Sequence, residues 1–128
     1  MSSLPPRPTK IFIYGTLQRG HSRSGLLAGQ RFLANVVTRP VYRLYDLGPH
    51  PGLVPDPHGN RIAGELWEVD PACLAMLDQI EDVPRLYRRE GVTLEDYEEQ
   101  EVQTYLYQGP VDGRPDCGGR WPPAAPRA

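Results

Sequence analysis

Glu81 is a carboxylate that stands where the surrounding apolar pattern predicts a buried side chain. Leu74 and Leu77 lie on one stripe of an expected helix over residues 71–81, and that stripe continues to Glu81. Burial disfavours the charged form of a carboxylate, and the negative end of the helix dipole acts in the same direction, so we expect a raised pKa. An acid with a pKa close to neutral can both accept and donate a proton. Glu81 is therefore the candidate general acid and base.

Other interpretations of the acidic residues stay open. Glu81 would be an ordinary surface residue if the helix end frays and the side chain bends into water. Glu65 is a competing acid on an expected strand over residues 61–69, but a facing arginine would pair with it. We expect Asp78, on the same helix as Glu81, to point toward solvent.

A second chemical feature is the segment from Tyr14 to Leu17, which follows an apolar run at residues 10–14. The run is β-branched or aromatic, which favours a strand buried on both faces. Gly15 permits a sharp turn, and the backbone N–H groups of Gly15, Thr16 and Leu17 then lack partners in a β-ladder. Such N–H groups can bind an anion or a developing oxyanion. The alternative is an ordinary strand followed by a tight turn.

The elements that must position these groups fit one α+β domain. The chain has 128 residues, of which 39% are hydrophobic, enough for a single core of moderate size. The helix has a favourable start, with Asp70 as N-cap and Pro71 at its first position. We expect further strands at residues 31–38, 42–47, 87–94 and 100–107, a short extended piece at 53–54 and a short helix within 21–29.

The ends of the chain differ from its centre in composition. Residues 1–8 and 109–128 are rich in proline, and the second of these segments is also rich in glycine. Such segments seldom build a core of their own. We therefore expect one domain over residues 9–108, flanked by these two terminal segments.

Composition argues against several classes of function. The net charge is −2 and no basic stripe is present, so we expect no nucleic-acid partner. No apolar run is long enough to span a bilayer and the N-terminus lacks a hydrophobic signal core, which predicts a cytoplasmic protein without a membrane partner. Cys73 and Cys117 have no clustered histidine, so we expect no metal site. The histidines are interpreted as surface or packing residues: His21, His50 and His58.

Several motifs, in matching order, resemble the γ-glutamylcyclotransferase superfamily, most closely its AIG2-like branch, which includes γ-glutamylaminecyclotransferase. The Tyr-Gly-Thr-Leu sequence resembles the family's entry loop, and Leu-Asp-Gln-Ile-Glu resembles its Leu-Asp-x-x-Glu helix end. The other similar motifs are Gly-x-x-Pro-x-Leu, Gly-x-Leu-aromatic and Pro-x-x-Tyr-x-Arg. The matching segments are residues 14–17, 46–53, 64–69, 77–81 and 84–89.

The resemblance implies an α+β fold, a small mixed β-barrel with a few packed helices, and a pocket between the first loop and the catalytic helix. It implies no metal and no organic cofactor. Relatives usually carry Gly after the catalytic Glu, whereas this chain has Asp82, which tolerates a left-handed helix cap and could raise the pKa of its neighbour further. The implied site residues are a catalytic Glu81 and a substrate-binding set of Tyr14, Gly15, Thr16, Leu17 and Tyr87.

The activity implied is a cyclotransferase reaction of the lyase type, in which a γ-glutamyl amine or amide cyclises to 5-oxoproline and releases a free amine. The implied partner is a small γ-glutamyl substrate, while the leaving amine and the oligomeric state stay open. The alternative is a non-catalytic module that binds a small carboxylate-bearing metabolite in the same pocket. A binder has no need for a carboxylic acid aimed at an anionic ligand, so Glu81 favours the enzyme.

Overall fold

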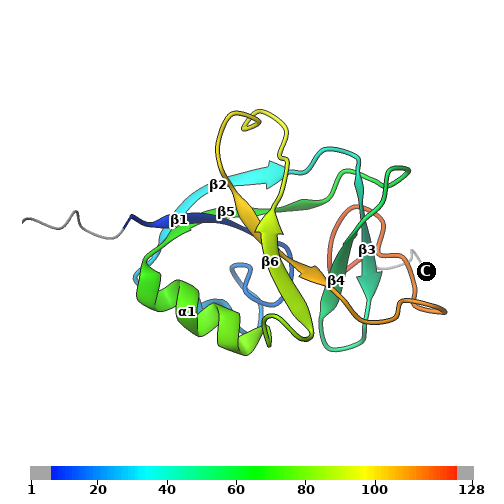
Figure 1. Ribbon diagram of the computed structural model, residues 1–128, viewed down its shortest axis with the longest axis horizontal. Helices are drawn as coiled ribbons and strands as arrows, with labels where there is room; N and C mark the ends of the chain where they lie inside the picture. The colour runs from blue at the N-terminus through cyan, green and yellow to red at the C-terminus, as the bar shows by residue number, and fades with distance from the viewer. Residues whose placement is uncertain (1–6, 124–128) are drawn as a thin grey trace, which may run out of the picture.

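The computed structural model describes residues 7–123. Within them, strands from the whole chain form one mixed sheet, accompanied by one α-helix and one short 3-10 helix (Figure 1). The strands run in the order β2-β5-β1-β7-β4-β3, and β6 pairs with β7. Their bounds are β1 (Thr9–Ile13), β2 (Arg31–Val37), β3 (Tyr42–Asp46), β4 (Pro51–Pro55), β5 (Ala63–Val69), β6 (Tyr87–Gly91) and β7 (Gln103–Tyr107); the helices are η1 (Ser24–Leu27) and α1 (Pro71–Ile80).

The predicted α+β class with a mixed sheet is confirmed, but the sheet does not close into the expected barrel. β1 is antiparallel to β5 and parallel to β7, so both kinds of pairing occur. β1 and β4 pair with opposite ends of β7, at Gln103 and Leu106, and β6 runs antiparallel to the same strand. Across the described residues β2 and β3 therefore remain the two ends of the strand order.

β1 lies at the centre of the fold, as its apolar sequence predicts. Ile11 and Ile13 belong to the apolar cluster that packs beneath α1, while Phe12 belongs to the cluster on the other face of the sheet. This alternation follows from the two-residue period of a strand. β1 thus carries the chain through the core. Tyr14 packs with Phe12 on one face of the sheet, and Leu17 of the following loop joins the cluster beneath α1 on the other.

α1 begins and ends where local capping chemistry predicts. The Asp70 carboxylate accepts a hydrogen bond of 2.7 Å from the backbone N–H of Cys73, and Pro71 occupies the first helical position. At the other end, the N–H of Glu81 still donates to the carbonyl of Leu77 at 2.9 Å, so Glu81 is the C-cap. The helix therefore holds Glu81 in a defined position at its last turn.

The buried stripe of α1 differs by one position from the predicted one. Cys73 and Leu77 are buried, whereas Leu74 is only half-buried. Cys73 and Leu77 are four residues apart, and a further step of four reaches Glu81. The correction strengthens the expectation for Glu81, because that residue continues the stripe that is buried most deeply.

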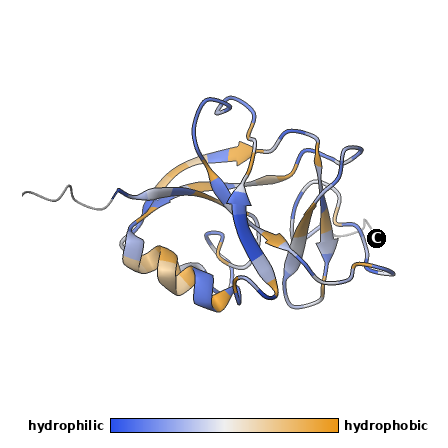
Figure 2. Cartoon of the chain, in the orientation of Figure 1, coloured by the Kyte–Doolittle hydropathy of each residue, from blue (hydrophilic) through white to orange (hydrophobic). Residues whose placement is uncertain are grey.

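β6 is a largely polar strand with a single buried side chain. Figure 2 shows this strand as largely hydrophilic, in keeping with its Arg-Arg-Glu sequence. Only Tyr87 at its start is buried, and this side chain joins the apolar cluster beneath α1. β6 consequently directs one tyrosine toward the same side of the sheet as Glu81.

The described part of the C-terminal segment, residues 109–123, lies against the sheet. Cys117 is buried in the main apolar cluster, and its backbone N–H donates to the carbonyl of Leu44 at 2.8 Å. The N–H of Ala63 donates to the carbonyl of Gly119 at 2.7 Å. Residues of this segment therefore contribute to the core of the domain. The domain boundary that we predicted at residue 108 remains a prediction. No helix among residues 7–123 is both long and apolar enough to cross a membrane.

Candidate active site

A cavity of about 150 Å³ lies between the loop that follows β1 and the C-terminal end of α1. We call it the site cavity. Every residue that the sequence proposed for the site lines it: Tyr14, Gly15, Thr16, Leu17, Glu81 and Tyr87. Within the described part of the chain, no three His, Cys, Asp or Glu side chains gather as a metal ion would require.

Glu81 brings a titratable carboxyl group into the site cavity. Burial raises the pKa of Glu81 from 4.5 to about 7, and the positive charge of Arg23 acts in the opposite direction. The carboxylate has no hydrogen-bond or ion-pair partner among the described side chains. At neutral pH Glu81 therefore populates both its protonated and its ionised form, and its carboxyl group is available to bind a ligand.

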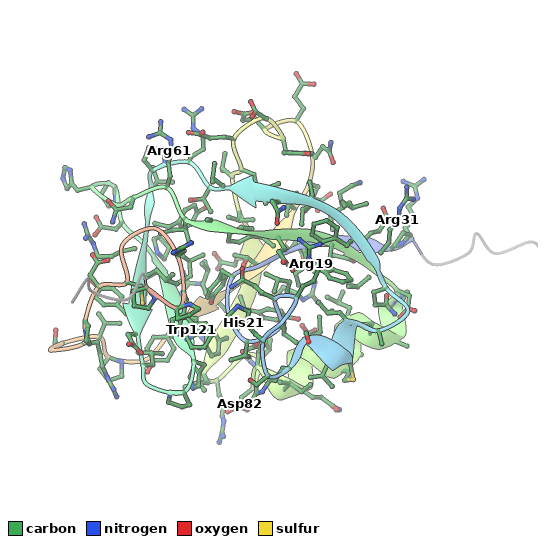
Figure 3. The ribbon with its side chains drawn as sticks, turned by 180° about the vertical axis from the view of Figure 1, so that it is seen from behind. Arg19, His21, Arg31, Arg61, Asp82 and Trp121 are labelled. Carbon is green, nitrogen blue, oxygen red and sulfur yellow. The ribbon has the colours of Figure 1, made fainter. Side chains whose placement is uncertain are left out.

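Asp82 does not take part in the raised pKa of Glu81. Its backbone adopts a left-handed conformation with φ of 54°, which agrees with the expected tolerance of Asp for this cap. Its carboxylate forms an ion pair of 2.9 Å with Arg85, and Figure 3 shows Asp82 at the edge of the molecule. The expectation that Asp82 adds to the pKa of its neighbour is thus wrong, because its side chain turns outward to an arginine.

The loop after β1 uses its carbonyls and leaves its N–H groups free. The Gly15 carbonyl accepts from the N–H of Gln18 at 3.0 Å, and the Thr16 carbonyl accepts from the N–H of Arg23 at 2.8 Å. The N–H groups of Gly15, Thr16 and Leu17 have no hydrogen-bond partner among the described residues. Free backbone donors that line a cavity form a local anion-binding surface.

Gly15 is required by close packing rather than by its backbone angles. A Cβ atom at this position would lie 2.9 Å from both Cγ and Cδ of Pro51. Pro51 belongs to β4 and also lines the site cavity, so the loop and β4 meet directly at Gly15. A larger side chain would have to push the loop or β4 away from the cavity.

The Tyr14 side chain ties the end of β1 to two other strands. Its hydroxyl donates to the Tyr105 carbonyl at 2.5 Å and accepts from the N–H of Leu53 at 3.3 Å. Burial raises the pKa of Tyr14 well above its ordinary value, so the hydroxyl stays protonated. Because both contacts are to backbone groups, Tyr14 serves the framework of the cavity.

Tyr87 holds the β4 side of the cavity in place. Its hydroxyl donates to the Pro51 carbonyl at 2.7 Å and lies 3.0 Å from Nδ1 of His50. The hydroxyl has a single proton, which the Pro51 carbonyl receives, so Nδ1 of His50 must be the donor to the Tyr87 oxygen. In the neutral imidazole, Nε2 of His50 is then the acceptor.

His50 and Arg23 are among the residues of the site cavity that the sequence did not predict. His50 was interpreted as a surface or packing residue, yet it lines the cavity beside Tyr87. The resemblance over residues 46–53 was the signal that pointed to its segment. Arg23 also lines the cavity, and no periodicity in the sequence singled it out, because it enters from an irregular loop.

The remaining acidic candidates have structural partners. Glu65 is buried and accepts hydrogen bonds from Nε of Arg19 and from Nε1 of Trp67, both at 3.0 Å, which is the arginine pairing that was weighed. Asp78 does not point to solvent as expected. It accepts from the Tyr105 hydroxyl at 2.7 Å and pairs with an arginine of β6. Glu81 differs from these acids because its carboxylate has no partner among residues 7–123.

The fold and the cavity define a class: a small α+β domain that presents one partly protonated carboxyl group opposite free backbone donors. The family model described as gamma-glutamyl cyclotransferase, AIG2-like matches residues 11–123. The chain belongs to this family, which confirms the superfamily and the branch that the motifs indicated.

Individual relatives agree with this assignment. The chain is 36% identical over 112 residues to the gamma-glutamylcyclotransferase family protein YtfP of Escherichia coli K12, covering 81% of this chain and 87% of that protein. It is 45% identical over 82 residues to a Vibrio cholerae protein named provisionally as a gamma-glutamylcyclotransferase, covering 64% and 70% of the two chains. The crystal structure of an AIG2-like protein from Mus musculus is similar at a TM-score of 0.67 and 27% identity, covering 94% of this chain and 99% of that one.

Proposed function

We propose that this protein is a cyclotransferase that converts a γ-glutamyl amine or amide into 5-oxoproline and a free amine, with Glu81 as general acid and base. The observation that supports the proposal is the position of the Glu81 carboxyl group. It lines the same cavity as the Gly15 loop, and its burial there raises its pKa to about 7. A group that moves a proton in both directions works best when its pKa lies near the working pH.

In the proposed reaction the Glu81 carboxylate takes a proton from the substrate α-ammonium group. The freed amine nitrogen attacks the γ-carbonyl carbon, which forms the C–N bond of the five-membered ring. The bond from that carbon to the leaving nitrogen then breaks, and Glu81 returns its proton to the departing amine. As the intermediate collapses, the ring nitrogen gives up a second proton, which Glu81 passes to the departing amine, so that the amine leaves as an ammonium ion and Glu81 ends as a carboxylate. No water and no redox partner enters the balance.

The loop N–H groups supply the second part of the mechanism. In this proposal the donors of Gly15, Thr16 and Leu17 hold the substrate α-carboxylate or the oxyanion of the intermediate. Removing one donor of this kind typically raises the barrier by about 3–4 kcal/mol. Both reacting groups belong to one molecule, so the cavity mainly has to fold the substrate into a ring geometry.

The proposed role of the tyrosines follows from their contacts. The Tyr14 and Tyr87 hydroxyls already bond to backbone groups of the cavity wall. We propose that the two tyrosines orient the substrate in two ways: their hydroxyls fix the position of the cavity wall, and their rings contact the substrate. His50 also lines the cavity, and in this proposal Nε2 of its neutral ring is a further acceptor for the substrate ammonium group.

The experiment is a panel of γ-glutamyl amines, γ-glutamyl amino acids and glutathione, with 5-oxoproline as the measured product. We expect at least one compound to yield product, and we expect Glu81→Gln to lose that activity. Binding of these compounds without any product would instead support a non-catalytic module that holds a carboxylate-bearing metabolite in the same cavity.

A further inference from the structure

Glu65 is a buried carboxylate that the proposed mechanism does not use. It lies on β5 opposite Ile13, the last residue of β1, close to the point where the loop of the site cavity begins. Glu65 itself does not line that cavity. A buried charge is unfavourable unless its hydrogen bonds are satisfied, so the partners of Glu65 indicate what it does.

Three N–H donors surround the Glu65 carboxylate, and two of them belong to one residue of the loop. Oε1 accepts from the backbone N–H of Arg19 at 3.1 Å and from Nε1 of Trp67 at 3.0 Å. Oε2 accepts from Nε of Arg19 at 3.0 Å. An ionised carboxylate only accepts hydrogen bonds, so it can serve all three donors at once. Glu65 therefore holds both the backbone and the side chain of Arg19.

The guanidinium of Arg19 also contacts β2. Its Nη2 donates to Oδ1 of Asn35 at 3.2 Å, and its Cζ lies 3.7 Å from the centre of the Phe32 ring. Figure 3 shows Arg19 over the middle of the molecule, whereas Arg31 and Arg61 extend from its outline. Arg19 therefore fastens the loop to the sheet, although its side chain is 51% exposed.

The free N–H groups of the loop lie between two anchored positions. Tyr14 is fixed before them by the bonds of its hydroxyl, and Arg19 is fixed after them by Glu65. Between these positions the N–H of Gln18 donates to the Gly15 carbonyl at 3.0 Å, which closes a short turn. Because the turn is short, the direction of its free N–H groups depends on where Arg19 is held. Such donors stabilise a developing negative charge only when they are already oriented toward it.

We propose that Glu65 is a positioning residue for the cyclotransferase reaction, which acts through Arg19 to keep the N–H groups of residues 15–17 directed into the site cavity. The effect on turnover rests on the proposed function, whereas the hold on the loop does not. Proton transfer remains with Glu81.

The kinetic test compares Glu65→Gln, Arg19→Ala and the double variant on the best γ-glutamyl substrate of the panel. The Gln amide has one acceptor oxygen instead of two and turns an NH₂ group toward one of the Arg19 donors. Each single variant should lower kcat/KM by about tenfold or more, the size expected when a charge-assisted hydrogen bond is lost. The double variant should lose no more than about threefold beyond the larger single loss, because both changes release the same anchor. Losses that multiply in the double variant, or a kcat/KM of Glu65→Gln within about twofold of the wild type, overturn the inference.

Arg43→Gln is the matched control. Arg43 forms a partly buried ion pair of 2.8 Å with Asp56 and does not line the site cavity. This variant should unfold at a lower urea concentration than the wild type and keep kcat/KM within about twofold. A loss of kcat/KM as large as that of Glu65→Gln would show that any broken ion pair has this effect, which also overturns the inference.

Amide hydrogen exchange separates this inference from the proposed function, since it needs no substrate. The N–H groups of Gln18 and Arg23 donate to carbonyls of the loop, and that of Asn60 donates to a carbonyl of β3. In Glu65→Gln, exchange at Gln18 and Arg23 should become about tenfold or more faster, while exchange at Asn60 stays within about twofold of the wild-type rate. If Glu65→Gln does not fold, Arg19→Ala takes its place in this comparison.

The outcomes of the exchange measurement are distinct. Faster exchange confined to the loop supports the inference even if wild-type protein makes no 5-oxoproline. Equal acceleration at all three N–H groups would mean a general loss of stability, and no acceleration at any of them would mean that the loop keeps its position without Glu65. Either of these two results contradicts the inference.

Discussion

Replacing Glu81 with Gln should stabilise the fold at alkaline pH while removing the proposed activity. Burial raises the pKa of Glu81 from 4.5 to about 7, so the folded chain holds this proton more tightly than the unfolded chain. The stabilising contribution of the protonated form is fully present below pH 4.5 and is lost as the pH rises through about 7. Gln keeps the shape of the neutral acid at every pH.

The magnitude follows from the difference between the two pKa values. The difference between 4.5 and about 7 is about 2.5 pKa units, which corresponds to about 3.5 kcal/mol at about 1.4 kcal/mol for each unit. The free energy of unfolding of Glu81→Gln, minus that of the wild type, should therefore increase by about 2–3 kcal/mol between pH 4.5 and pH 8. Above pH 8 the difference should stay constant, because Glu81 is then ionised in both states.

The assay is urea unfolding of both proteins, followed by circular dichroism across this pH range. Glu99→Gln is the control, since Glu99 is exposed and forms no ion pair within the described residues. Its difference from the wild type should not depend on pH to a comparable extent. A pH-independent difference for Glu81→Gln as well would show that Glu81 titrates like a surface carboxylate, which refutes the account of its burial.

Further predictions concern the loop, the pH profile and the cavity wall. Gly15→Val should lower kcat/KM by about 100-fold or more, because the valine side chain would collide with Pro51. Thr16→Ala should keep kcat/KM within about threefold of the wild type. Full activity of Gly15→Val would show that the loop is a simple turn. The kcat/KM of the wild type should rise through pH about 7 with a slope of one proton, and a profile that is flat from pH 5 to 8 would exclude Glu81 as the base. Tyr87→Phe should lower the free energy of unfolding by about 1–2 kcal/mol, since the Pro51 carbonyl loses its donor; no change in urea denaturation would show that water replaces the hydroxyl.

Local chemistry in the sequence was enough to predict most elements. The start of α1 follows from Asp70 and Pro71, and its end at Ile80 leaves Glu81 as the cap. β1 was recognisable because its residues are apolar on both faces. Glu81 was found because the helical period carries the buried stripe to a carboxylate, and the structure gives that group the partly buried place that the period predicts.

What could not be predicted depends on contacts between distant parts of the chain. His50 and Arg23 reach the cavity from irregular loops, where no period relates neighbouring residues. Asp78 was expected to face water because it lies off the apolar stripe of the helix. Its partner Arg89 is on β6, and the position of β6 relative to α1 is a property of the fold that the helix sequence does not reveal. Closure of the sheet likewise depends on how β7 shares its edges, which the sequence of β7 does not reveal.

The central claim is that Glu81 transfers the proton in a cyclotransferase reaction, and the rate of 5-oxoproline formation tests it most directly. The comparison uses wild-type protein, Glu81→Gln and Asp82→Asn on the best substrate of the panel. Asp82 is the adjacent carboxylate, and it is paired with Arg85 at the surface. We predict that Glu81→Gln loses at least about 100-fold in kcat, while Asp82→Asn stays within about threefold of the wild type. Product formation by Glu81→Gln at the wild-type rate would contradict the account.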